Sequence, residues 1–245
     1  MRVGLFVTCL VDAMRPHIGF ATIKLLEAAG CEVLVPEQQT CCGQPEYNSG
    51  DRKSAEAMAL KFLGEFETFD YVVLPSGSCT GMVRVHYSGL FRNDPALHER
   101  FMALGQRTYE LTDFLVNIAK LEKVPGNFNG TLTYHDSCSG LRELDVYKQP
   151  RALLAKMPGV NLHEMVESTT CCGFGGTFSV KYGELSTRMA ENKCLHIVST
   201  HADAIVGGDL GCLLNIEGRL RRIGDHTTRV LHIAEVLSDV DGEVT

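Results

Sequence analysis

The chain has 245 residues, of which 44% are hydrophobic and 22% are charged. This length suits one large domain or two of about 120 residues, and the composition is typical of an ordered globular protein. The formal net charge is −7 and no segment is densely basic. The attraction for phosphate that nucleic-acid-binding proteins share is therefore missing, which excludes nucleic acid as a partner.

The N-terminal stretch has the features of a short signal peptide, since Met1 and Arg2 precede an apolar run that ends at Ala13. Cys9, however, lies within this stretch and belongs to an internal repeat, so we expect no cleavage there. No apolar run approaches the ~18–20 residues that span a bilayer, and we expect no transmembrane segment. We therefore predict a cytoplasmic, reducing location, where cysteines are metal ligands or catalysts more often than cross-links.

The first half of the chain alternates short apolar strands with amphipathic helices. Uniformly apolar strands in such an alternation indicate a parallel sheet that is covered on both faces. The predicted elements, in chain order, are a strand at 2–8, a helix at 18–29, strands at 32–36 and 71–75 around a helix at 54–66, and a short strand entering a helix at 108–115.

The second half repeats this order after a stretch at 124–130 that has the composition of a linker. We predict two α/β lobes related by internal duplication, at 1–123 and 131–245, each a small, mostly parallel sheet flanked by helices. The predicted elements are strands at 131–135, 162–166 and 204–207, helices at 150–157, 182–200 and 213–222, and a strand entering a helix at 229–237.

Eight of the ten cysteines follow the same repeat, and each lies just after a predicted strand. In an open α/β sheet the carboxyl ends of the strands are the place where ligands bind, so three loops can bring four thiols together. We therefore expect each set to bind a metal or a cluster. The first set is Cys9, Cys41, Cys42 and Cys79, and the second set is Cys138, Cys171, Cys172 and Cys212.

The spacing within the two sets argues against coincidence. Cys41 follows Cys9 by 32 residues and Cys171 follows Cys138 by 33. The steps from the paired cysteines to the last member are 37 residues in the first set and 40 in the second. A glycine, Gly43 or Gly173, follows each pair.

An iron–sulfur cluster fits adjacent cysteines better than a single zinc ion does. Neighbouring side chains on extended backbone point in opposite directions, whereas zinc sites commonly use cysteines two to four residues apart. Four thiolates are the usual complement of an iron–sulfur centre. Zinc in both sites and thiol–disulfide chemistry remain open as alternatives. Cys31 and Cys194 lie outside the repeat and are expected to be buried packing thiols.

These motifs resemble the CCG, or cysteine-rich, domain family of iron–sulfur oxidoreductases, and the resemblance covers essentially the whole chain. The family includes the cysteine-rich subunit of heterodisulfide reductase and the iron–sulfur subunits of glycolate and anaerobic glycerol-3-phosphate oxidoreductases. Two repeats without a ferredoxin segment, with the sequences Pro-Ser-Gly-Ser-Cys at 75–79 and Tyr-His-Asp-Ser-Cys at 134–138, are most similar to the lactate utilisation A family. That family belongs to a three-part system that oxidises L-lactate to pyruvate.

The chain departs from the heterodisulfide reductase pattern at one position in each repeat. The final Cys-x-x-Cys motif has lost its first cysteine, which is Ser76 in one repeat and Asp209 in the other. A fifth ligand is thus absent from both sets, so the cluster type and number stay open.

Several other signals are weaker. The glycines at 173–176 do not have the spacing of a dinucleotide-binding loop and are better placed to donate backbone N–H groups to cluster sulfurs. His135, Asp136 and Ser137 are consecutive and cannot form a catalytic triad with one another, but His135 is placed to hydrogen-bond a thiolate or a cluster. His17 is expected to be a surface residue or a capping residue at a helix start, and the arginines at 219–222 are expected on a solvated face.

The resemblance implies an iron–sulfur subunit of an oxidoreductase complex, with electron transfer in the oxidation of L-lactate or a similar 2-hydroxy acid. Because no flavin or nicotinamide site is visible, other subunits must share the chemistry. Two alternatives are a cluster-based disulfide or thiol reductase and a structural zinc protein. The sequence identifies no catalytic residue.

Overall fold

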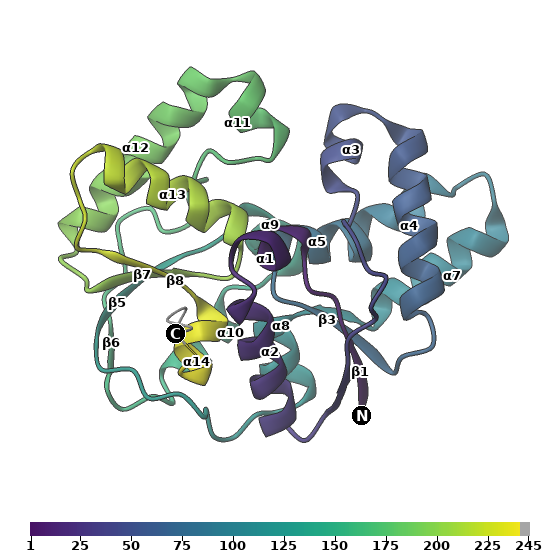
Figure 1. Cartoon of the computed structure of the whole chain (residues 1–245), viewed down its shortest axis with the longest axis horizontal. Coiled ribbons are helices and arrows are strands. Elements are labelled where there is room, and N and C mark those ends of the chain that lie inside the picture. Colours follow the sequence, from purple (N-terminus) through teal and green to yellow (C-terminus); the bar gives the residue numbers. More distant parts are fainter. Residues whose placement is uncertain (241–245) are drawn as a thin grey trace.

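The computed structural model describes residues 1–240 and contains two parallel four-stranded sheets. The prediction of an α/β fold with two similar lobes is confirmed, because both sheets place their strands in the same order (Figure 1). The first sheet has the order β2-β1-β3-β4, with β1 at Arg2–Leu5, β2 at Glu32–Leu34, β3 at Tyr71–Leu74 and β4 at Thr108–Glu110. The second has the order β6-β5-β7-β8, with β5 at Gly130–His135, β6 at Val160–Leu162, β7 at Ala204–Gly207 and β8 at Arg229–His232.

The helices of the first lobe begin at recognisable capping residues. Asp51 and Asp94 accept backbone N–H groups at the starts of α4 and α7, and Pro95 occupies the first turn of α7. The lobe contains α1 (Cys9–Met14), α2 (His17–Ala28), α3 (Gln44–Ser49), α4 (Arg52–Phe66), α5 (Gly77–Gly81), the π-helix η1 (Met82–His86), α6 (Tyr87–Leu90), α7 (Pro95–Gln106), α8 (Leu111–Asp113) and the π-helix η2 (Phe114–Ile118).

The second lobe repeats most of this arrangement. It contains α9 (Cys138–Leu144), α10 (Lys148–Leu154), α11 (Thr177–Lys181), α12 (Gly183–Ser199), α13 (Leu210–Arg222) and α14 (Ile233–Ser238). The strand predicted at 162–166 is displaced: β6 pairs with β5 from Val160 to Leu162, and the chain then leaves the sheet in a loop in which Glu167 has a positive φ.

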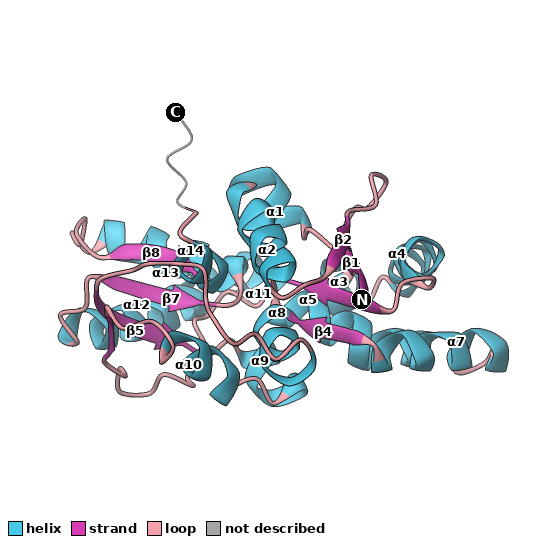
Figure 2. Cartoon of the chain, turned by 90° about the horizontal axis from the view of Figure 1, so that it is seen from below, coloured by secondary structure: helices cyan, strands magenta, loops and turns pink. Residues whose placement is uncertain are grey.

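The two lobes share one hydrophobic core. A single cluster of buried side chains extends from Val3 and Leu25 in the first lobe to Leu132 and Leu237 in the second. At the end of the second lobe, α14 packs on α2, and α8 of the first lobe contacts α10. Figure 2 shows α2, α8 and α14 between the two sheets. Each lobe thus contributes a short helix from its C-terminal end to the interface.

The stretch at 124–130 packs closely between the lobes. The side chain of Val124 is buried in the shared core, and the backbone N–H of Gly126 donates to the carbonyl of Leu237 at 2.7 Å. The division at 1–123 and 131–245 stays a prediction, and residues 241–245 lie outside the described part of the chain. Within residues 1–240, no helix has both the length and the apolar character needed to cross a membrane.

Candidate metal centres

The first cysteine set lies at the carboxyl ends of three neighbouring parallel strands. Cys9 begins α1 directly after β1, the pair Cys41 and Cys42 lies in the loop between β2 and α3, and Cys79 lies in α5 after β3. All four cysteines line one cavity. The sheet topology therefore brings together residues that are up to 70 positions apart in the sequence.

The sulfur atoms of this set form a continuous series. The Sγ atoms of Cys9 and Cys41 are 3.8 Å apart, those of Cys42 and Cys79 are 3.2 Å apart, and the thiols of Cys41 and Cys42 interact with each other. The expectation that adjacent cysteines diverge is therefore wrong. Gly43, directly after the pair, has a φ of +74° and turns the chain at this point.

The second cysteine set repeats this arrangement. Cys138 begins α9 after β5, Cys171 and Cys172 lie in the loop between β6 and α11, and Cys212 lies in α13 after β7. The thiols interact in the same order, from Cys138 to Cys171 to Cys172 to Cys212.

Glycine N–H groups support both pairs. The backbone N–H of Gly43 donates to Cys41 Sγ at 3.4 Å, and that of Gly173 donates to Cys171 Sγ at the same distance. Gly173 has a φ of +86°, and a Cβ atom there would lie 2.7 Å from the carbonyl oxygen of Ser186. Both the conformation and the close contact thus require glycine at this position.

Hydrogen bonds within each set favour a thiolate at the first cysteine of each pair. Bonds from the thiols of Cys42 and Cys9 lower the pKa of Cys41 to about 2, and bonds with Cys138 and Cys172 lower the pKa of Cys171 to about 2. The same bonds, together with burial, raise the pKa of Cys42 and of Cys172. Deprotonated thiols are the form that binds metals, so the donor set fits a metal or an iron–sulfur centre.

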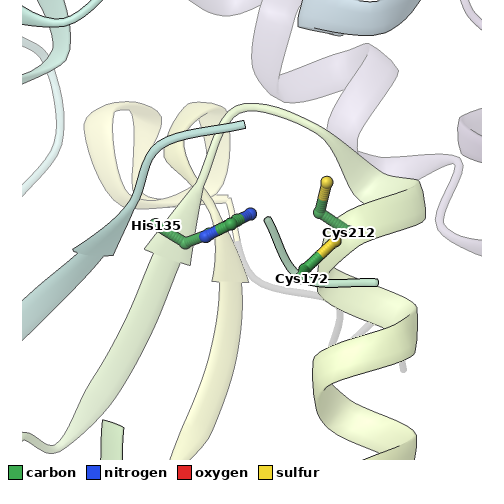
Figure 3. A group of neighbouring side chains, drawn as sticks. All are labelled: His135, Cys172 and Cys212. Atoms are coloured by element: carbon green, nitrogen blue, oxygen red, sulfur yellow. The ribbon is translucent and has the colours of Figure 1, made fainter. Parts of the chain in front are cut away.

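His135 adds a nitrogen donor to the second set. It ends β5, is 1% exposed, and neither ring nitrogen has a hydrogen-bond partner. A ring nitrogen and the sulfurs of Cys172 and Cys212 lie within 4.8 Å of one another, and the ring extends toward both thiols (Figure 3). Burial and the nearby charge of Lys193 lower the pKa of His135 to about 3, so the imidazole is neutral.

Ser76 and Asp209, which replace the fifth cysteine of each repeat, bind each other across the lobes. Asp209 Oδ2 accepts from Ser76 Oγ at 3.2 Å and from the backbone N–H of Ser78 at 2.9 Å. Ser76 Oγ also accepts from the N–H of Cys79 and caps α5. These positions therefore join the two lobes beside the first cysteine set.

A common cleft reaches both cysteine sets. One part of it contains Cys9, Cys41, Cys42 and Cys79, and an adjoining part contains Cys138 and Cys212. The polar residues that line both parts are Gln44, Asn48, Ser78 and Asp209.

The sequence of each lobe matches a known family. Residues 3–84 and 132–217 both match CCG, described as a cysteine-rich domain. The chain belongs to the CCG cysteine-rich domain family. Proteins named "Lactate utilization protein A" from Geobacillus thermodenitrificans and Bacillus subtilis are 48% and 46% identical to it over 238 residues, which cover 97% of this chain and 99% of each relative.

Among solved structures, a hypothetical protein from Helicobacter pylori has the same fold as the two CCG repeats. The TM-score is 0.66 at 12% sequence identity, over 100% of this chain and 49% of that chain. The present chain thus spans about half the length of that structure, and the likeness concerns the fold alone.

The other residues singled out from the sequence of the CCG repeats have structural roles. Cys31 and Cys194 are buried in the hydrophobic core, and the thiol of Cys194 lies 3.6 Å from the carbonyl oxygen of Ile216. His17 is not a free surface residue, because its Nε2 lies 2.8 Å from Glu235 Oε1 of α14. Asp136 forms an ion pair with Arg151.

The arginine run near the end of α13 also has partners. Arg219 pairs with Glu191 at 2.7 Å, and Arg221 pairs with Glu217 at 3.5 Å.

Proposed function

We propose that this chain is an iron–sulfur subunit of an oxidoreductase complex that oxidises L-lactate, or a similar 2-hydroxy acid, to the 2-oxo acid. The observation that carries the proposal is the convergence of four thiols at the carboxyl edge of each sheet. The names of the relatives, "Lactate utilization protein A", supply the substrate class.

In this proposal the eight cysteines of the repeats hold one centre in each lobe. Such a centre supplies one-electron transfer when it is bound. The chain's own residues keep the thiolates fixed, donate the N–H groups of Gly43 and Gly173 to sulfur, and bury part of each site. A rigid and partly shielded donor set is what electron transfer requires.

Oxidation of a 2-hydroxy acid to a 2-oxo acid releases two electrons and two protons. We assign the removal of hydrogen to a flavin or another redox cofactor on partner subunits, which also bind the acid. The centres of this chain accept the electrons one at a time and pass them to a one-electron carrier of the complex. Metal-binding thiolates need a reducing compartment, so the proposal includes a cytoplasmic location.

The test is an analysis of iron, acid-labile sulfide and zinc in protein purified without oxygen. We expect iron and sulfide in comparable amounts, with a visible absorption band that bleaches on reduction. Zinc without sulfide would overturn the electron-transfer proposal.

A single tetrahedral ion in each lobe is the second candidate, and one distance favours it. Two thiolates bound to one ion at ~2.3 Å lie ~3.8 Å apart, and the sulfurs of Cys9 and Cys41 have this separation. In a 4Fe–4S cluster each thiolate binds a different iron, so a cluster of that type requires these sulfurs to separate, whereas a 2Fe–2S cluster, in which two thiolates share each iron, does not. The metal analysis distinguishes the two candidates directly.

A cluster-based disulfide or thiol reductase is the third candidate, favoured by the cleft that reaches both cysteine sets. Such an enzyme would reduce a disulfide when supplied with electrons, without any partner subunit. The proposed electron-transfer subunit would show no disulfide turnover alone but would restore lactate oxidation when added to its partners.

A further inference from the structure

The two cysteine sets repeat closely, but the residues behind them do not. His135 ends the central strand of the second sheet three positions before Cys138, and Phe6 occupies the matching position three residues before Cys9. Both are 1% exposed. The first lobe therefore places a phenyl ring where the second places an imidazole.

A second matched position is likewise aromatic in the first lobe and polar in the second. Gly43 lies against Met58 of α4, and Gly173 lies against Met189 of α12. One helical turn later, α4 carries Phe62 and α12 carries Lys193. Phe6 and Phe62 pack with ring centroids 5.0 Å apart, whereas Lys193 is a charged neighbour of His135.

Lys193 makes no hydrogen bond with the imidazole of His135. Its Nζ donates to the backbone carbonyls of Glu167 and Ser168, at 2.5 and 3.2 Å. The backbone of Ser168 lies close to the ring as well, but not in a geometry that makes a hydrogen bond. Both nitrogens of His135 are therefore buried without a partner.

An unpartnered buried polar group destabilises the folded state, and native proteins rarely keep one without a reason. The arrangement in Figure 3 supplies a reason, because the ring extends toward two thiols that belong to a proposed metal site. A neutral imidazole is one of the commonest metal ligands, and its nitrogen lies within 4.8 Å of the sulfurs of Cys172 and Cys212.

We propose that His135 is a ligand of the second centre, which is then a mixed thiolate and imidazole site, while the first centre is held by thiolates alone. This inference rests on the proposed metal binding by the cysteine sets. Since imidazole ligands give iron–sulfur centres a more positive reduction potential than thiolate ligands do, exchanging the His135 imidazole for a thiolate should make the potential of the second centre more negative.

The experiment isolates the second centre and identifies its ligands. In a Cys42→Ser/Cys79→Ser chain, loaded anaerobically with ferrous iron and sulfide, X-ray absorption at the metal edge should show one imidazole besides sulfur. His135→Phe, which copies the first lobe, should lose the imidazole signal and bind less metal. His135→Cys should keep the metal, lose the imidazole signal and shift the potential to a more negative value.

The matched control is His86→Gln, because His86 lines the cleft beside Cys138 and Cys212 but pairs with Glu143. This variant should keep the imidazole signal. A second control tests folding. In a chain that keeps all its cysteines and carries only His135→Phe, iron bound by the unaltered first centre shows that the variant is folded. A second centre with sulfur ligands only, or an imidazole signal that survives both His135 variants, would overturn the inference.

The outcomes also separate this inference from the proposed function. Zinc with an imidazole ligand would refute electron transfer and support the role of His135. Iron and sulfide bound by thiolates alone would support electron transfer and refute the role of His135. A chain that binds no metal would overturn both proposals.

Discussion

The ion pair between Arg151 and Asp136 determines how the loop after β5 is held beside the second centre. Asp136 is 1% exposed, and the guanidinium of Arg151 binds its two carboxylate oxygens at 2.7 and 2.9 Å. The same guanidinium binds both oxygens of Glu164, at 2.6 and 3.0 Å. We predict that Arg151→Met destabilises the fold by about 3–5 kcal/mol, because it leaves a buried charge without its partner.

Thermal unfolding followed by circular dichroism measures this loss. In a protein of this size, 1 kcal/mol corresponds to about 2–4 °C, so the melting temperature should fall by about 6–20 °C. The double variant Arg151→Met/Asp136→Leu removes both charges and should recover most of the loss, since buried pairs replaced by apolar groups are often near neutral. A single variant that melts within about 2 °C of the wild type, or a double variant that is no better than the single one, would refute the reasoning.

Three further predictions concern the stability contributed by residues outside the two cysteine sets. Burial raises the pKa of Glu110 from 4.5 to about 7, so its stabilising contribution is complete below pH 4.5 and is lost as the pH rises through 7. The free energy of unfolding of Glu110→Gln, relative to that of the wild type, should therefore rise by up to roughly 3 kcal/mol from pH 5 to pH 8. A difference between the two proteins in urea unfolding that is the same at both pH values would contradict this. Gly77→Ala should destabilise by about 1–3 kcal/mol, because the new Cβ would lie 2.7 Å from Ser137 Oγ, whereas the matched control Gly64→Ala, which meets no atom within 4 Å, should not. Cys194→Ser should cost about 1–3 kcal/mol in the same assay and keep the full metal content, and loss of metal would assign this thiol to a centre.

The repeated order of strands and helices was predictable because hydrophobic periodicity is a local property. The strand predicted at 204–207 is β7, and the helix predicted at 54–66 is α4 with two more residues at its start. α7 was missed, although Asp94 and Pro95 are ordinary start signals. The error at 162–166 has a different origin, since the pairing with β5 determines where β6 ends.

The lobe interface was not predictable from local patterns. The packing of α14 on α2 and the bond between Ser76 and Asp209 join segments that lie more than 130 residues apart. Such contacts leave no periodic signal in the sequence. The loss of a ligand cysteine at both positions was visible in the sequence, but the hydrogen bond that joins the two replacing residues depends on how the lobes pack.

The candidate site was predictable in its membership and less so in its geometry. The spacing of the eight cysteines identified both sets, because the carboxyl edge of a parallel sheet collects loops of this kind. The predicted divergence of the adjacent thiols was wrong, because the thiols of Cys41 and Cys42 interact with each other. His135 was placed next to Cys138, but its burial and its unpartnered nitrogens depend on the tertiary packing.

Metal content across cysteine variants tests the central claim most directly. If each lobe holds its own centre, Cys42→Ser or Cys79→Ser should remove about half of the iron and sulfide, Cys172→Ser or Cys212→Ser should remove the other half, and one change in each lobe together should remove all of it. Loss of the whole signal from any single change would indicate one centre shared between the lobes. Unchanged iron in every variant would contradict the assignment of these cysteines as ligands.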